Sequence, residues 1–158
     1  MTNLKLLSHR GNISGKNPER ENTVTYIDEA LWYGFDVEID VWVKKNKILL
    51  GHDMGIEEVT IDYLRDTRLL CHAKNRDALE LMLSDSLIHT FWHEEDRYTI
   101  SSKGIPIVYP DIPALKNSIV IIRGSRVIDI PDNCYGVCAD NIQEYKDIFK
   151  KQDYKDVL

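Results

Sequence analysis

Two acidic side chains, Glu38 and Asp40, lie two residues apart in the apolar stretch VEIDVW (37–42). Neighbouring side chains of an extended chain point to opposite faces, so the two carboxylates share one face and the apolar side chains share the other. An acidic face is typical of a strand with one side in water. The alternative is a cation site, because hard cations bind carboxylate oxygens and two carboxylates on one face can reach a shared ion. The neighbouring segments decide between these two interpretations.

Further reactive side chains lie at or near the ends of other apolar runs. They are His9, Arg10, His52, Asp53, His72 and Lys74. In a barrel of parallel strands the carboxyl ends meet at one rim, where the catalytic sites of such folds are built. A solvated strand face needs no such mixture of acids, bases and cations. The sequence therefore favours a site for chemistry over a solvated face.

The elements that must position these residues are short strands and a few helices. Strands are predicted at residues 4–9, 36–43, 47–52, 68–73, 88–93, 105–110, 119–124 and 135–140. Apolar residues at helical spacing predict helices within 24–34, 75–86 and 142–151. Strands that are separated by helices favour parallel βα units over a sandwich.

Eight such strands predict an α/β fold, a compact TIM-type (β/α)8 barrel. Barrels of this kind usually have about 250 residues, whereas this chain has 158. We therefore expect several outer helices to be reduced or missing, with loops in their place at 53–67 and 94–118. The chain is long enough for one domain with a hydrophobic core and short for two, so residues 1–158 are predicted to form a single domain.

The composition argues against some classes of partner. A net charge of −6 argues against nucleic acid or an anionic membrane surface as the main partner. No apolar run approaches the roughly 20 residues of a membrane span, and the N-terminal stretch lacks the apolar core of a signal peptide. We expect a cytoplasmic protein with no integral membrane segment, and the sequence predicts no oligomeric state.

The three cysteines, Cys71, Cys134 and Cys138, are predicted to be free thiols. Their number is odd and small for a chain of this length, which argues against a disulfide framework. If Cys134 and Cys138 lie on one strand, they stand about 13 Å apart, beyond the reach of a disulfide. Their spacing also differs from the Cys-x-x-Cys pairs of zinc sites. We expect all three to serve packing.

Four short motifs follow one another along the first third of the chain. They are His9-Arg10-Gly11, Glu21-Asn22-Thr23, Glu38-Ile39-Asp40-Val41 and His52-Asp53. In order and spacing they resemble the motifs of glycerophosphodiester phosphodiesterases, within the larger phosphatidylinositol-phospholipase-C-like superfamily. The resemblance covers residues 5–53 and continues less closely at 71–74 and 137–141. The chain is similar to a short, divergent member of this family.

This resemblance implies a metal-dependent phosphodiester hydrolase with a role in lipid metabolism. Glu38 and Asp40 then hold a divalent cation, Mg²⁺ or Ca²⁺, with Mn²⁺ as a further option. His9 and His52 are the general acid and base, and imidazole suits both roles because its pKa lies near neutrality. The order of their roles stays open, as does the nucleophile, which is either water or a neighbouring hydroxyl of the substrate.

Cationic and supporting residues complete the expected site. Arg10 and Lys74 are predicted to bind the substrate phosphate, because its oxygens gain negative charge as the phosphorus is attacked. Glu21 either binds the metal or orients His9 or Arg10. Asp53 either orients His52 or caps the following turn.

The stretch HTFWHEEDRYT (89–99) has His89 and His93 four residues apart, which is metal-ligand spacing on a helix. The aromatic and β-branched residues between them favour a strand, so we predict a strand end with exposed acids and no second metal site. Trp92, near the end of this strand, is predicted to form a substrate-binding wall beside His93.

His72 departs from the family pattern, which has an acidic metal ligand at this position. We predict His72 to be a metal ligand, the alternative being a structural or substrate-contacting role. An imidazole in place of a carboxylate shifts the preference from calcium toward magnesium, manganese or zinc-like ions. The substrate-covering insertions of the family are also absent. The expected partner is a small-molecule phosphodiester, and the alternative function is an inactive module that binds phosphate or sugar phosphate.

Overall fold

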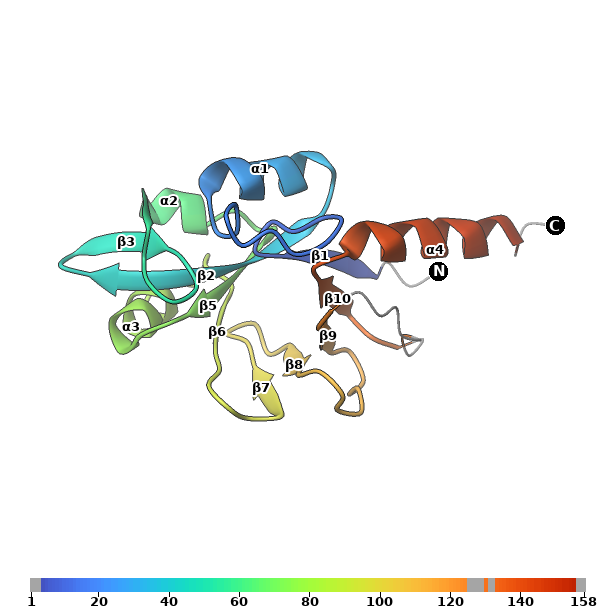
Figure 1. The fold of residues 1–158 in the computed structure, drawn as a ribbon. Helices are drawn as coiled ribbons and strands as arrows, with labels where there is room; N and C mark the ends of the chain where they lie inside the picture. Colours follow the sequence, from blue (N-terminus) through green and yellow to red (C-terminus); the bar gives the residue numbers. More distant parts are fainter. Residues whose placement is uncertain (1–3, 125–129, 131–132, 156–158) are drawn as a thin grey trace.

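The computed structural model describes residues 4–124, 130 and 133–155, with side chains described as far as Phe149. Within these residues the chain forms ten strands and four helices (Figure 1). The strands are β1 (Lys5–His9), β2 (Asp36–Lys44), β3 (Lys47–Leu50), β4 (Glu57–Val59), β5 (Leu69–Ala73), β6 (Thr90–Trp92), β7 (Tyr98–Ile100), β8 (Pro106–Val108), β9 (Ile119–Ile122) and β10 (Gly136–Ala139). The helices are α1 (Val24–Trp32), α2 (Ile61–Leu64), α3 (Arg76–Leu83) and α4 (Ile142–Lys155).

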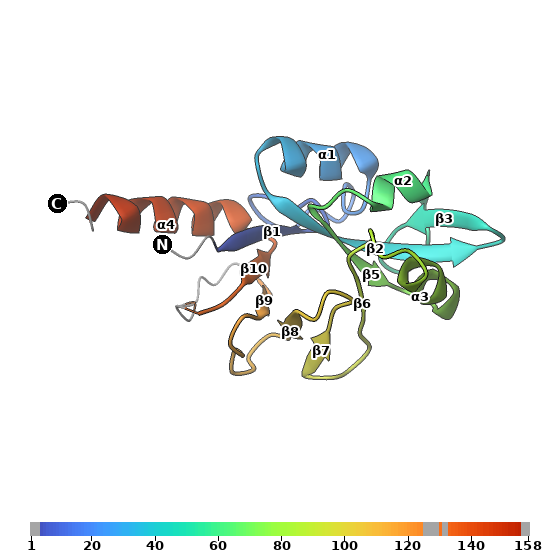
Figure 2. The same ribbon diagram turned by 180° about the vertical axis from the view of Figure 1, so that it is seen from behind.

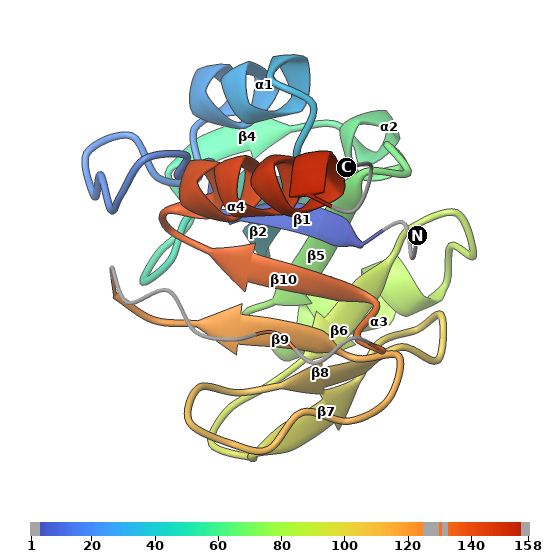
Figure 3. The ribbon, with the colours of Figure 1, turned by 90° about the vertical axis from the view of Figure 1, so that its right-hand side faces the viewer.

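The ten strands belong to one mixed sheet. Seven of those described run parallel, in the spatial order β6-β5-β2-β1-β10-β9-β8. β3, β4 and β7 are each antiparallel to the strands beside them. The sheet is curled: Figure 3 shows β1, β10, β9, β8 and β7 side by side with β2, β5 and β6 behind them. The hydroxyl of Thr99 in β7 donates to the carbonyl of Trp92 in β6 at 2.8 Å, so these two strands meet.

The predicted TIM-type (β/α)8 barrel is wrong. The structure is a mixed sheet with four short helices, and strands do not alternate with helices. After β2 the chain turns directly into antiparallel β3, through Lys45 and Asn46 with φ of 50° and 62°. A two-residue hairpin turn of this kind needs positive φ at both positions. β7 likewise pairs with β8 as an antiparallel neighbour where a barrel would have a helix.

Each of the eight predicted strand segments contains a strand, and the three predicted helices correspond to α1, α3 and α4. The expected loop at 53–67 contains β4 and α2, and that at 94–118 contains β7 and β8. The three cysteines are free and buried, as predicted. The single domain over 1–158 stays a prediction.

The helices cover the sheet where apolar side chains need shielding. α1 buries Ile27 and Ala30 fully, within a core cluster that includes Val37 and Ile39 of β2. α3 is capped by Asn75, whose side-chain oxygen accepts from the backbone N–H of Ala78 at 3.1 Å. α4 lies beside β1 and β10 and continues beyond the sheet (Figures 1 and 2). No helix in the described part of the chain is long and apolar enough to cross a bilayer.

Candidate active site

Parallel pairing of three strands brings the reactive side chains together. His9 of β1 lies opposite Glu38 of β2, and Asp40 lies opposite His72 of β5. A cavity of about 180 Å³ opens over this part of the sheet. Its lining consists of His9, Arg10, Glu38, His52, His72, Lys74, Phe91, His93, Glu94, Tyr109, Ile121 and Arg123. Six of the predicted site residues therefore face one cavity.

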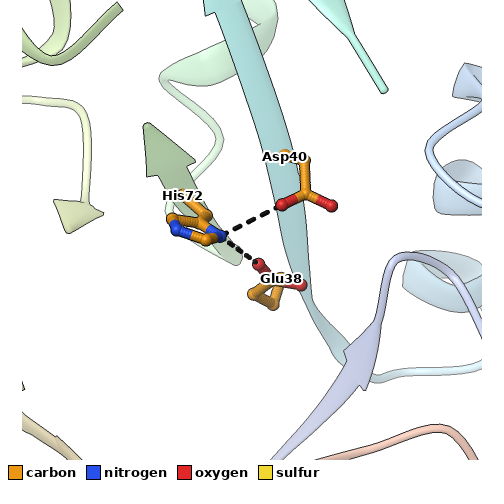
Figure 4. A group of neighbouring side chains, drawn as sticks. All are labelled: Glu38, Asp40 and His72. Atoms are coloured by element: carbon orange, nitrogen blue, oxygen red, sulfur yellow. Dashed lines mark hydrogen bonds and ion pairs between the residues drawn. The ribbon is translucent and has the colours of Figure 1, made fainter. Parts of the chain in front are cut away.

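Glu38, Asp40 and His72 form a tight acidic and imidazole cluster (Figure 4). One ligand atom from each lies within 4.8 Å of the others. His72 Nδ1 is 3.0 Å from Asp40 Oδ1 and 3.7 Å from Glu38 Oε1. Both acids are buried, and Glu38 Oε2 has no hydrogen-bond partner among the described residues. Carboxylate oxygens and an imidazole nitrogen suit a divalent cation, and a buried oxygen without a partner is what such an ion would satisfy.

The two carboxylates of this cluster differ in acidity. Burial alone would raise the pKa of Asp40, but its hydrogen bond with His72 and the charges of Arg10 and Lys74 hold that pKa well below its usual range. Burial and the nearby charge of Asp40 raise the pKa of Glu38. Glu38 therefore carries its negative charge at a cost that a bound cation would offset.

Arg10 is fixed by carboxylates on two sides. Its Nη1 donates to Glu21 Oε2 at 3.2 Å, and its Nε lies 2.8 Å from Asp40 Oδ2 as an ion pair without hydrogen-bond alignment. Arg10 and Asn22 both have left-handed backbones, with φ of 57° and 59°. Asn22 Nδ2 donates to Asp40 Oδ2, and Asn22 Oδ1 accepts from the backbone N–H of Asp40, both at 2.9 Å. One oxygen of Asp40 is thus fully engaged, and the other faces His72.

His9 belongs to a buried network. Its Nδ1 is 2.7 Å from Asp140 Oδ1, and its Nε2 is 3.8 Å from Glu38 Oε2. Asn12 Nδ2 donates to both Asp140 and Glu21 at 2.9 Å. Burial opposes a charged His9 ring, but the hydrogen bond to Asp140 and the charge of Glu38 outweigh it and raise the pKa of His9. These hydrogen bonds fix the His9 ring with its Nε2 atom toward the cluster of Glu38, Asp40 and His72.

His52 approaches the same cavity from an exposed turn. Its Nδ1 lies 2.6 Å from Asp53 Oδ1, and these side chains are 45% and 89% exposed. Burial and the positive charge of Arg10 lower the pKa of His52. The turn depends on Gly51, at φ 150°, where an added Cβ would lie 1.9 Å from the carbonyl oxygen of Met54. Glycine is therefore needed to present His52 at this position.

The remaining predicted residues differ in placement. Lys74 lines the cavity with its Nζ 3.5 Å from Asp40 Oδ1. Glu21 does not line the cavity and accepts hydrogen bonds from Arg10 and Asn12, and both of its predicted roles stay predictions. Asp53 pairs with His52, as one of its two predicted roles requires.

Trp92 is not brought into the cavity. It packs against the core cluster that contains Ile39 and Ala73, whereas its neighbours Phe91 and His93 line the cavity. Side chains alternate along β6, so only one of these two sets can face the site. On this side of the cavity the lining side chains are therefore Phe91 and His93.

Sequence reasoning missed three supporting residues: Asn12, Asn22 and Asp140. Asn22 stands inside the Glu21-Asn22-Thr23 motif, and Asp140 follows β10 directly, inside the predicted strand segment 135–140. An acid at the carboxyl end of a strand that pairs with β1 was the available signal for Asp140.

A larger cavity of about 580 Å³ adjoins the site. It shares His9, Arg10, His52 and Arg123 with the smaller one and extends toward Lys16 and Glu144. There is thus space beside the two histidines for groups attached to a reacting centre.

Comparison with known proteins assigns this chain to no family. No protein-family model matches it, and no curated protein gives a significant match. The resemblance to glycerophosphodiester phosphodiesterases stays a prediction that rests on the four motifs.

Proposed function

We propose that this chain is a metal-dependent phosphodiesterase that cleaves small phosphodiesters by acid–base catalysis. The observation that carries the proposal is one cavity lined by the Glu38 and His72 ligands, two histidines and two cations. The proposal rests on this site and not on the fold, because similar chemistry occurs on unrelated folds.

The two histidines divide the proton transfers between them. His9 is partly buried and paired with Asp140, and its pKa is raised, which favours the protonated ring that donates to the departing alkoxide. His52 is more exposed and lowered in pKa, which favours the neutral ring that accepts a proton from the attacking oxygen. Their different surroundings thus support an acid at His9 and a base at His52.

Charge on the phosphate is met by fixed cations. Lys74 Nζ lines the cavity, and the Arg10 guanidinium is held in place by Glu21 and Asp40. Preorganised cations stabilise the charge that develops on phosphate oxygens without reorganising during the reaction. A divalent cation held by Glu38, Asp40 and His72 would supply Lewis-acid polarisation of a phosphoryl oxygen.

The proposed substrate is a small molecule and not nucleic acid, in line with the net charge of −6 and the cavity of about 180 Å³. A cytoplasmic location is part of the same proposal. It is supported by three free thiols, because secreted proteins of this size commonly use disulfides.

The test is phosphorus NMR on a panel of glycerophosphodiesters and a lysophospholipid, with Mg²⁺, Mn²⁺ or Ca²⁺ added in turn. A chelator and the variant His9→Gln serve as negative controls, and His89→Gln is the matched control because His89 bonds Ser101 outside the cavity. We expect a metal-dependent monoester or cyclic phosphate, reduced about 10²–10⁴-fold in His9→Gln and unchanged in His89→Gln.

The product also identifies the nucleophile. A cyclic phosphate indicates attack by a substrate hydroxyl, and a monoester formed without it indicates water. Absence of any product with every metal would contradict the proposal. Phosphate-ester binding without turnover would then favour the inactive binding module.

A further inference from the structure

Both ring nitrogens of His72 face hydrogen-bond acceptors. Its Nε2 lies 3.2 Å from the backbone carbonyl oxygen of His93, and its Nδ1 lies 3.0 Å from Asp40 Oδ1. A ring that keeps its hydrogen on Nε2 can present the Nδ1 lone pair to a metal ion. Phe91 stacks on the ring with centroids 4.6 Å apart and planes 12° apart, so the ring plane is fixed as well.

The Nδ1 atom faces only acceptors. Asp40 Oδ1 and Glu38 Oε1 lie 3.0 and 3.7 Å from it, on one side of the ring (Figure 4). Three electron-rich atoms at these distances need a positive centre among them, either a proton on Nδ1 or a metal ion. Ligand atoms that share an ion at bond lengths of about 2.1 Å lie about 3.0–3.4 Å apart. The observed spacings are close to that range.

The cluster has few oxygens for a hard ion. Asp40 Oδ2 is occupied by Arg10 and Asn22, so Asp40 can offer one oxygen. Glu38 offers at most two, of which Oε2 has no hydrogen-bond partner among the described residues. Calcium takes about six to eight oxygen ligands, and magnesium is bound by oxygens alone in most protein sites. An imidazole nitrogen suits zinc, cobalt and related ions better.

We infer that this centre selects Zn²⁺ or Co²⁺ over Mg²⁺ and Ca²⁺, with the His72 Nδ1 atom as the selecting ligand. This inference rests on the metal centre of the proposed function but not on the reaction. The carbonyl at Nε2 belongs to the backbone of His93, so the fold itself holds the ring with Nδ1 toward Asp40 and Glu38.

The test is direct metal binding by the full chain. Co²⁺ binding is followed by visible absorption, and Zn²⁺, Mg²⁺ and Ca²⁺ are then added as competitors. We expect Zn²⁺ and Co²⁺ to bind at least about 100-fold more tightly than Ca²⁺ or Mg²⁺. Zn²⁺ should also shift the ¹⁵N resonance of His72 Nδ1 in the wild-type protein, a readout that needs no variant.

Two variants test whether His72 is the source of the preference for Zn²⁺ over Ca²⁺. His72→Glu supplies a third carboxylate and should reduce the preference for Zn²⁺ over Ca²⁺ by at least about tenfold. His89→Gln is the matched control and should leave both affinities unchanged, because His89 lies outside the cavity.

The outcomes separate the inference from the proposed function. Selective Zn²⁺ binding without cleavage of any diester supports the inference and contradicts the phosphodiesterase. Equal binding of Zn²⁺ and Ca²⁺, no metal binding, or an unshifted His72 Nδ1 resonance would overturn the inference. Cleavage supported by Ca²⁺ alone would overturn it too, while leaving the phosphodiesterase in place.

Discussion

Two histidines that line the same cavity, His9 and His52, are each paired with an aspartate, and the two pairs differ in their surroundings. His9 and Asp140 lie 2.7 Å apart with side chains 21% and 11% exposed, whereas His52 and Asp53 lie 2.6 Å apart at 45% and 89%. Asp140 also accepts a hydrogen bond from Asn12 Nδ2. For Asp53, the described part of the chain shows no partner other than His52. The contact distances are nearly equal, so burial and connectivity must decide what each pair contributes.

The two pairs differ in how strongly their opposite charges interact. Water and salt screen the exposed pair, and such pairs contribute little. The buried pair interacts in a medium of lower polarity and is held by further hydrogen bonds. We therefore expect Asp140 to determine the orientation and the protonation of His9, and we expect loss of the Asp53 charge to have little effect on kcat.

The largest effect is expected for Asp140→Asn. Asn keeps the shape of the side chain but lacks the negative charge, so His9 loses both its orientation and the stabilisation of its protonated form. We expect kcat for phosphodiester cleavage to fall about 10–100-fold. An unchanged kcat would remove the distinction between the two pairs.

A much smaller effect is expected for Asp53→Asn, the matched variant in the exposed pair. Because this ion pair is solvated, kcat should fall by less than about threefold. Steady-state kinetics in low and high salt measure this. A loss as large as that of Asp140→Asn would show that exposure does not set the contribution of these pairs.

The smallest signal is the pH dependence of stability in the metal-free protein. The raised pKa of His9 contributes stability that is complete below the ordinary value of 6.5 and is lost as pH rises through the folded-state pKa. The lowered pKa of His52 has the opposite sign: its contribution is complete above 6.5 and is lost as pH falls through the folded-state pKa.

Urea unfolding between pH 5 and pH 8, with a chelator present, measures these slopes. His9→Gln should flatten the decline above pH 6.5, and His52→Gln should flatten the decline below it. Equal pH profiles for wild type and His9→Gln would contradict the proposed surroundings of His9.

Much of the local structure follows from the sequence. Apolar runs bounded by turn residues predicted eight of the strand segments, and helical spacing predicted α1, α3 and α4. β4 and β7 have only three residues each, and β4 contains Glu57 and Glu58, so neither gives an apolar run. The direction of β3 depends on the turn at Lys45 and Asn46, which lacks the Asn-Gly signal of such hairpins.

The placement of candidate site residues could be predicted where it depends on a single strand. Glu38 and Asp40 share a face because strand side chains alternate, and this needs no long-range information. Asp140 reaches His9 only because β10 pairs with β1 across more than 120 residues of chain. The placement of Trp92 outside the cavity also depends on long-range pairing, since β6 pairs with β5.

The central claim is that Glu38 serves a cation and not stability, and the variant Glu38→Gln tests it most directly. Gln keeps the shape and removes a buried charge whose pKa is raised by burial and by Asp40. Asp36→Asn is the control on the same strand, because Asp36 pairs with Lys5 at 3.1 Å outside the cavity.

The measurement combines urea unfolding of the metal-free protein with metal-dependent phosphodiester turnover. We predict that Glu38→Gln equals or exceeds the wild type in free energy of unfolding while its turnover falls at least about 100-fold. Asp36→Asn should retain its turnover. Full turnover in Glu38→Gln would contradict the account.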